Sequence, residues 1–232
     1  MTTTLLEKQF ANKIMILDGA MGTMLQSANL TADDFGGEEY EGCNEHLVLT
    51  APEIVKYIHE EYLKAGADII STNTFGATNI VLDDYNLGDK ALIINETAAK
   101  LAKEAAEKYS TEDWPRFVAG AMGPTTKALS VTGGTTFEKL TSAYEEQAIG
   151  LIQGGVDALL LETSQDARNV KAAYLGIQKA FEKTNKRVPL IISCTIEPMG
   201  TTLAGQSIDS FYISIEHMNP LAVGLNCATG PE

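Results

Sequence analysis

Short apolar runs alternate with longer helical patterns along almost the whole chain, and this alternation limits the folds that it can adopt. The helical patterns place apolar residues three and four positions apart, and the runs between them are rich in β-branched residues. Repeated strand–helix units of this kind form a parallel sheet. Because the runs are continuously apolar, both faces of the sheet are expected to be covered. The expected strands are Ile14–Leu17, Asp68–Ser71, Phe117–Ala121, Ala158–Leu161, Leu190–Cys194 and Leu221–Leu225.

The expected helices carry start and stop signals. The segment Pro52–Ala65 has apolar residues on one face and begins with a proline, which suits a first helical turn. It is followed by Gly66, which suits a helix end. The same spacing of apolar residues continues in three later segments. These further expected helices are Asp89–Tyr109, Phe137–Gln153 and Asp166–Lys183.

Polar side chains follow nearly every expected strand, and their distribution separates two parallel-sheet folds. A TIM barrel builds its site from the carboxyl ends of many strands. A doubly wound sheet concentrates its ligand contacts at one switch point. The pattern therefore favours an α/β fold, a TIM (β/α)8 barrel with about its first six βα units present. We expect one domain, residues 1–232, incomplete at its C-terminus. The polar groups are Asp18, Thr72–Thr74, Thr125, Glu162–Thr163, Thr195, Glu197 and Asn226–Cys227.

Single residues of this set allow more than one interpretation. Glu162 follows four apolar residues, and a carboxylate there is costly unless it is paired or used, which favours a functional role. Asp18 precedes Gly19 and could equally form a tight turn. Cys194 lies inside an apolar strand and is typical of a core thiol. Cys227 taken alone makes no metal motif, and the histidines form no cluster; they are His46, His59 and His217.

The composition excludes several classes of function. The 232 residues include 17 basic and 31 acidic side chains, and the formal net charge of −14 repels nucleic-acid backbones and anionic membranes. No apolar run reaches the roughly 18–20 residues of a membrane span. Three cysteines are an odd and sparse number, which fits a reducing compartment, so the expected location is cytoplasmic. No glycine-rich phosphate-binding motif follows a strand.

Six phrases of the sequence resemble one known family. They run in family order from about residue 10 to the end: ILDGAMGTMLQ, GCNEHLVLTAPEIV, YLKAGADIISTNTFGAT, VAGAMGPTTK, LLLETSQD and GLNCATGPE. Each phrase alone is weak, but six in order are specific. They resemble the homocysteine S-methyltransferase family. The phrases GAMGTMLQ and CNEHLVLTAPEI are most similar to its cobalamin-dependent methionine synthase branch.

The resemblance implies a TIM barrel and a zinc site. In the family, three cysteine thiolates hold the zinc, and the first of them matches Cys227. The other two form a Cys-Cys pair near the end of strand eight, which this sequence does not contain. A zinc ion with three protein ligands and one open position can take the sulfur of homocysteine and remove its proton. A free thiol is mostly protonated at neutral pH, so this step activates the substrate.

The resemblance also suggests roles for residues around the substrate. Glu162 and Asp18 match positions near the amino-acid part of homocysteine, where a carboxylate suits the ammonium group. Asn73 and Phe75, from the TNTF phrase, match positions in the pocket wall. Asn226, beside the cysteine, is expected to orient the metal loop. With Cys227, these residues form the expected site.

The expected reaction is the transfer of a methyl group from methylcobalamin to homocysteine, which forms methionine. In the family, cobalamin and methyltetrahydrofolate bind other domains, so these would be linked partners or separate ones. Two alternatives stay open: a homocysteine methyltransferase that uses S-methylmethionine or betaine directly, and an inactive fragment. We expect the isolated 232-residue chain to be inactive, and its first and sixth strands to leave open edges that favour homo-oligomers.

Overall fold

A single parallel sheet organises the computed structural model, which describes residues 3–130 and 133–229. Its five strands pair in chain order, β1-β2-β3-β4-β5, and every pair is parallel. The order does not reverse about a switch point, as it would in a doubly wound sheet. The α/β prediction is therefore confirmed, and the open sheet fits part of a barrel. The strands are β1 (Ile69–Ser71), β2 (Phe117–Met122), β3 (Ala158–Ser164), β4 (Leu190–Cys194) and β5 (Ala222–Leu225).

The expected first strand, Ile14–Leu17, is wrong as an extended strand. It makes one parallel bridge, between Leu17 and Ile69. The neighbouring backbone still follows β1, since the N–H of Ile69 donates to the carbonyl oxygen of Ile16 at 3.0 Å. Ile14 is 89% exposed, so the segment has a partner on one side only and packs little apolar surface. An edge with so few contacts forms only a short ladder.

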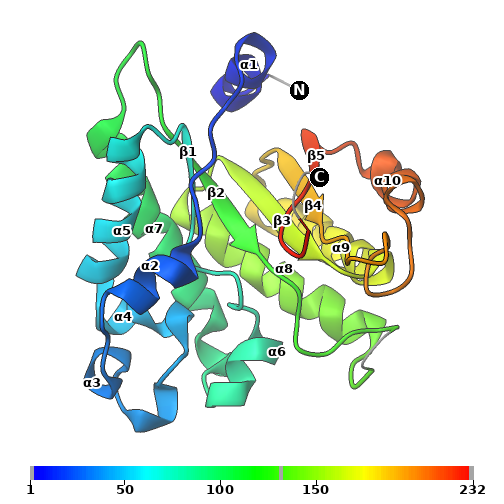
Figure 1. Cartoon of the computed structure of the whole chain (residues 1–232), viewed down its shortest axis with the longest axis horizontal. Coiled ribbons are helices and arrows are strands. Elements are labelled where there is room, and N and C mark those ends of the chain that lie inside the picture. Colours follow the sequence, from blue (N-terminus) through cyan, green and yellow to red (C-terminus); the bar gives the residue numbers. More distant parts are fainter. Residues whose placement is uncertain (1–2, 131–132, 230–232) are drawn as a thin grey trace.

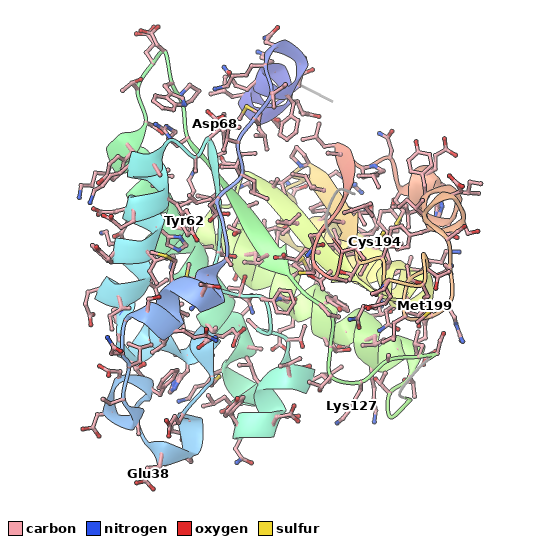
Figure 2. All side chains as sticks on the ribbon, viewed as in Figure 1. Glu38, Tyr62, Asp68, Lys127, Cys194 and Met199 are labelled. Atoms are coloured by element: carbon pink, nitrogen blue, oxygen red, sulfur yellow. The ribbon has the colours of Figure 1, made fainter. Side chains whose placement is uncertain are left out.

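Asp68 fixes the start of this edge segment. Its carboxylate accepts hydrogen bonds from Lys13 Nζ at 2.7 Å, from the N–H of Ile16 at 2.9 Å and from Trp114 Nε1 at 2.7 Å. Figure 2 shows Asp68 at the end of the sheet nearest α1, away from Lys127 and Met199 in the loops after β2 and β4. The chain from Lys13 to Leu17 is therefore held against the start of β1.

Helices cover one face of the sheet (Figure 1). The prediction Pro52–Ala65 is confirmed as α5, and Gly66 ends it with a left-handed φ of 112°. The other three predictions are confirmed with small shifts, because a 3-10 turn precedes α7 and Asp166 caps α9 from outside. The main helices are α5 (Pro52–Ala65), α7 (Ala91–Tyr109), α8 (Phe137–Gly154), α9 (Ala167–Thr184) and α10 (Ile208–Ile215). The shorter ones are α1 (Leu5–Asn12), α2 (Met21–Ser27), α3 (Ala32–Phe35), α4 (Leu47–Thr50) and α6 (Asn79–Leu82).

The two faces of the sheet bury different sets of side chains. Leu159 and Leu161 of β3 pack into the large cluster between the sheet and the helices. Ala158 and Leu160 point to the opposite, inner face, where they pack with Leu6 of α1. This alternation follows from the two-residue period of a strand. It fixes which residues at the strand ends face inwards. None of the helices in residues 3–130 and 133–229 is long and apolar enough to cross a bilayer.

Glycine allows the helices of the outer layer to approach closely. A Cβ atom on Gly176 of α9 would lie 2.5 Å from the carbonyl oxygen of Thr141 and 2.8 Å from the backbone nitrogen of Glu145, both on α8. Backbone atoms cannot move aside as a flexible side chain can. The contact between α8 and α9 therefore depends on the missing side chain.

We expect Gly176→Ala to lower the free energy of unfolding by about 1–3 kcal/mol, because the added methyl group forces the two helices apart. Gly22→Ala in α2 is the matched control, since a Cβ there meets no atom within 4 Å. That control should stabilise the helix by about 0.5–1 kcal/mol. Urea denaturation measures both. Equal stability of the two variants would contradict the close helix packing.

Candidate functional site

The carboxyl ends of the strands place polar side chains on the inner face of the sheet. Glu162 follows Ala158 and Leu160 at the two-residue period, so its side chain faces inwards. Ser193 follows Ile191, which packs on the same inner cluster. Asp18 lies beside the end of β1 through its bonds to Ser71. The inner face is thus apolar towards the amino ends of the strands and polar at their carboxyl ends.

Asp18 is held by both donors of Ser71. The N–H of Ser71 donates to one carboxylate oxygen at 2.8 Å, and the Ser71 hydroxyl donates to the other at 2.8 Å. Burial nevertheless raises the pKa of Asp18 to about 7, against the opposing effect of these bonds. The carboxylate is fixed in direction and easily protonated.

Glu162 is the second carboxylate of the inner face. Burial, with an added contribution from the negative charge of Asp18, raises its pKa to about 7. The two groups are therefore close enough for the charge of one to act on the other. Two such carboxylates favour either a bound proton or a bound cation between them. An ammonium group is one cation that fits this need.

A bulge shapes the end of β3. The strand pairs Leu161 with Ile192 and then Ser164 with Cys194, so two residues of β3, Glu162 and Thr163, stand opposite one residue of β4. Thr163 has a left-handed φ of 56°. A β-branched residue in this region is an outlier, with a cost on the order of 1–3 kcal/mol. Such strain persists only where the surrounding contacts enforce it.

The side-chain amide of Asn226 supplies those contacts. Its oxygen accepts the N–H of Thr163 at 3.1 Å and the hydroxyl of Ser193 at 2.7 Å. Its nitrogen donates to the Thr163 hydroxyl at 2.8 Å and to the sulfur of Cys227 at 3.2 Å. An amide has two donors and two acceptor positions, so all four are used. Asn226 thus joins the ends of β3, β4 and β5.

Cys227 lies exposed just beyond β5, with a left-handed φ of 61°. The other two thiols are buried elsewhere. Cys194 packs in the cluster between sheet and helices, in accord with a core thiol, and Figure 2 labels it on β4. Cys43 packs in a separate cluster with α4 and α5. Burial raises the pKa of each of these two thiols to about 11.

The described residues do not form a metal centre by themselves. Within residues 3–130 and 133–229, no group of three His, Cys, Asp or Glu side chains could hold an ion. Cys227 is the exposed thiol among these residues.

Asn73 and Phe75 lie in the loop after β1 and are fixed by neighbouring loops. Asn73 is buried, and its Nδ2 donates to the carbonyl oxygen of Asn44 at 2.7 Å. Phe75 is 42% exposed, and its carbonyl oxygen accepts the N–H of Gly123 at 2.9 Å. The side-chain amide of Asn73 therefore donates to another loop of the protein, whereas the side chain of Phe75 is partly accessible.

A cavity of about 240 Å³ lies beside Glu162. Tyr144 of α8 and Val170 of α9 line it, together with the loop that follows β2. Of the six expected site residues in the described structure, Glu162 is the one in its lining. The charge of Asp18 thus acts on Glu162, and Asn226 bonds to Cys227, but the six residues do not all line this cavity.

Three residues were not predicted to contribute to the site. Ser71 binds Asp18, and Thr163 and Ser193 bind Asn226. Each is a hydroxyl residue at the end of a strand, and its role depends on a partner far away in the sequence. A serine or threonine in a strand carries no local signal of such a partner. Only the position of Thr163 beside Glu162 pointed towards the site.

The profile of the homocysteine S-methyltransferase family matches residues 15–232. The chain belongs to this family. It is 43% identical over 229 residues to the methionine synthase of Mycobacterium leprae (strain TN), a match that takes in 99% of this chain and 19% of that protein. The chain therefore spans about a fifth of the length of this relative.

Solved structures share the fold. The metallated form of the homocysteine methyltransferase MmuM from Escherichia coli superposes with a TM-score of 0.76 at 19% identity, covering 94% of this chain and 76% of that one. Its oxidized form gives 0.77 at 22% identity, covering 96% and 75%. This chain thus has the same fold as these enzymes, in accord with the predicted TIM-barrel type.

The raised pKa values of Asp18 and Glu162 predict how stability varies with pH. Both values lie above those of the same groups in an unfolded chain, so the folded protein binds more protons between about pH 4 and 7. Its stability therefore falls as the pH rises through that window. Asp18→Asn removes one charge, and the amide can still accept the Ser71 N–H and donate to its hydroxyl.

We expect this variant to lose less stability than the parent between about pH 5 and pH 8, by on the order of 1–3 kcal/mol. Urea unfolding at each pH measures the difference. Asp89→Asn, which removes an exposed charge, is the control for net charge. A pH dependence that is the same in Asp18→Asn and the parent would contradict the burial of this carboxylate.

Proposed function

We propose that this chain is the homocysteine-activating part of an enzyme that transfers a methyl group from methylcobalamin to homocysteine and forms methionine. Membership of the homocysteine S-methyltransferase family supports the acceptor. The similarity to a methionine synthase supports the product. The observation that carries the proposal is the pair of inward carboxylates, Asp18 and Glu162, near the strand end that bears Cys227.

In this proposal, Glu162 binds the ammonium group of homocysteine. The cation would replace the proton that the carboxylate pair otherwise favours, so both groups could be ionised together. Asp18, held by Ser71 beside the end of β1, contributes the second negative charge. Phe75 forms part of the pocket wall, and Asn73 positions the loop that carries it. These contacts orient the amino acid with its thiol towards β5.

Cys227 marks the sulfur end of the proposed site. We propose that it is one of three cysteine ligands of a zinc ion, with the other two outside the described residues. Zinc, when bound, would favour the thiolate form of homocysteine. The chain itself holds the Cys227 sulfur through Asn226 Nδ2. Asn226 is therefore a positioning residue of this site.

Cobalamin and methyltetrahydrofolate would bind other domains, linked or separate, in keeping with the 19% share of the methionine synthase that the chain matches. The three free cysteines and the net charge of −14 support a cytoplasmic location without nucleic-acid or membrane partners. Exposed apolar edge residues, such as Ile14 and Leu225, support pairing with a further chain or segment.

Glu162→Gln tests the ammonium contact. The amide keeps the shape of the side chain and removes its charge, so homocysteine binding by the full-length protein should weaken roughly tenfold to a hundredfold. Isothermal calorimetry measures the affinity. Glu146→Gln is the control, because this partly buried carboxylate of α8 bonds to Asn79 in the helix layer. An unchanged homocysteine affinity in Glu162→Gln would remove the ammonium contact from the proposal.

Elemental analysis tests the zinc ligand. A polypeptide of these 232 residues should keep little zinc after dialysis against a chelator, because its described residues bring one thiol to the site and a catalytic zinc uses about three protein ligands. The full-length protein should keep about one zinc, and Cys227→Ser should lower that content. Cys194→Ser is the control. Stoichiometric, chelator-resistant zinc in the 232-residue polypeptide would refute this assignment.

A further inference from the structure

Asn226 links two residues with strained backbones, one in β3 and one just beyond β5. Thr163 and Cys227 both have left-handed φ angles, 56° and 61°. Neither is a glycine, and Thr163 is β-branched, so a regular strand end would avoid both conformations. Strain of this kind is kept where other contacts enforce it and where the site uses the resulting geometry.

The contact that enforces it is a reciprocal pair of hydrogen bonds. Asn226 accepts the N–H of Thr163 at 3.1 Å and donates to its hydroxyl at 2.8 Å. The same amide nitrogen donates to the Cys227 sulfur at 3.2 Å. Thr163 directly follows Glu162 in the bulge. One amide therefore connects the residue beside the inward carboxylate with the thiol beyond β5.

Other bonds to this loop come from β4. The N–H of Asn226 donates to the carbonyl oxygen of Cys194 at 3.1 Å, and the Thr195 hydroxyl donates to the carbonyl oxygen of Asn226 at 3.1 Å. These bonds hold the backbone of the loop against β4. A further bond from β4 reaches the side-chain amide itself, whose oxygen accepts the Ser193 hydroxyl at 2.7 Å. Beyond the ladders that both strands form with β4, the Thr163–Asn226 pair is a direct link between the ends of β3 and β5.

We propose that the Thr163–Asn226 pair sets the distance between Glu162 and Cys227 and thereby selects homocysteine over cysteine. The inference rests on the proposed function, in which Glu162 takes the ammonium group and Cys227 marks the sulfur end. Cysteine has the same ammonium and thiol groups as homocysteine but is shorter by one methylene group. A fixed distance between Glu162 and Cys227 suits an amino acid of one length. A variable distance accommodates both homocysteine and cysteine.

Three variants of Thr163 separate this role from a merely structural one. Thr163→Ser keeps the hydroxyl acceptor for Asn226. Thr163→Ala removes the acceptor and keeps the backbone strain. Thr163→Gly removes the acceptor and also relieves the strain, because glycine adopts a left-handed φ freely. A loss of selectivity in Thr163→Gly therefore cannot come from a strained fold. Thr195→Ala is the control, since its hydroxyl contacts only the backbone of Asn226.

The test measures the dissociation constants of L-homocysteine and L-cysteine by calorimetry with the full-length protein. We expect the parent, Thr163→Ser and Thr195→Ala to prefer homocysteine. In Thr163→Ala and Thr163→Gly, homocysteine binding should weaken about tenfold and cysteine binding less than roughly twofold, so the preference shrinks. The rate at which iodoacetamide alkylates Cys227 should also change in these two variants, because the Asn226 amide that donates to its sulfur loses one of its own hydrogen-bond partners.

Three outcomes overturn the inference in different ways. If Thr163→Gly weakens both amino acids equally, or leaves their ratio unchanged, the pair does not select chain length although the proposed function stands. If the parent protein does not bind homocysteine, the proposed function fails and the inference fails with it. The Thr163→Ser variant must retain the preference, because it keeps every hydrogen bond of the pair; its loss would also overturn the inference.

Discussion

Parallel pairing in chain order is the constraint on which the site depends. Each strand is followed by a chain segment that returns to the start of the next strand, so every strand points the same way. The carboxyl ends of β1, β3, β4 and β5 therefore meet at one end of the sheet. Residues as distant in the sequence as Ser71 and Asn226 can then lie on one inner face. The main helices pack on the other face of the sheet (Figure 1).

Burial of two like charges gives this face its chemical character. Asp18 and Glu162 each interact unfavourably with the low-dielectric surroundings when ionised. The hydrogen bonds from Ser71 compensate in part for Asp18. A site of this kind is less stable when empty than an apolar one would be. That cost is compatible with function, because a bound cation recovers the electrostatic energy that folding gave up.

Much of the architecture could be predicted from local patterns, and the exceptions have physical reasons. Pro52 and Gly66 mark both ends of α5 because each has a backbone preference that acts locally. The segment Ile14–Leu17 has the composition of a strand but only one neighbour, which a sequence pattern does not reveal. Glu162 stood out as a charge after an apolar run. Thr163 did not stand out as a hydrogen-bond partner of Asn226, because that amide lies 63 residues away in the sequence.

The anchoring of Asp18 has a consequence for local unfolding. Its segment is attached by Asp68 at one end and by Ser71 at the other, with the Leu17–Ile69 bridge as its strand pairing. Few apolar contacts oppose opening, so its amide hydrogens should exchange sooner than those of the buried strand β2. One carboxylate of the candidate site is thus carried by a segment that is held by hydrogen bonds and exposes most of its apolar side chains. A cation bound between Asp18 and Glu162 would fasten this edge, so that occupancy and order rise together.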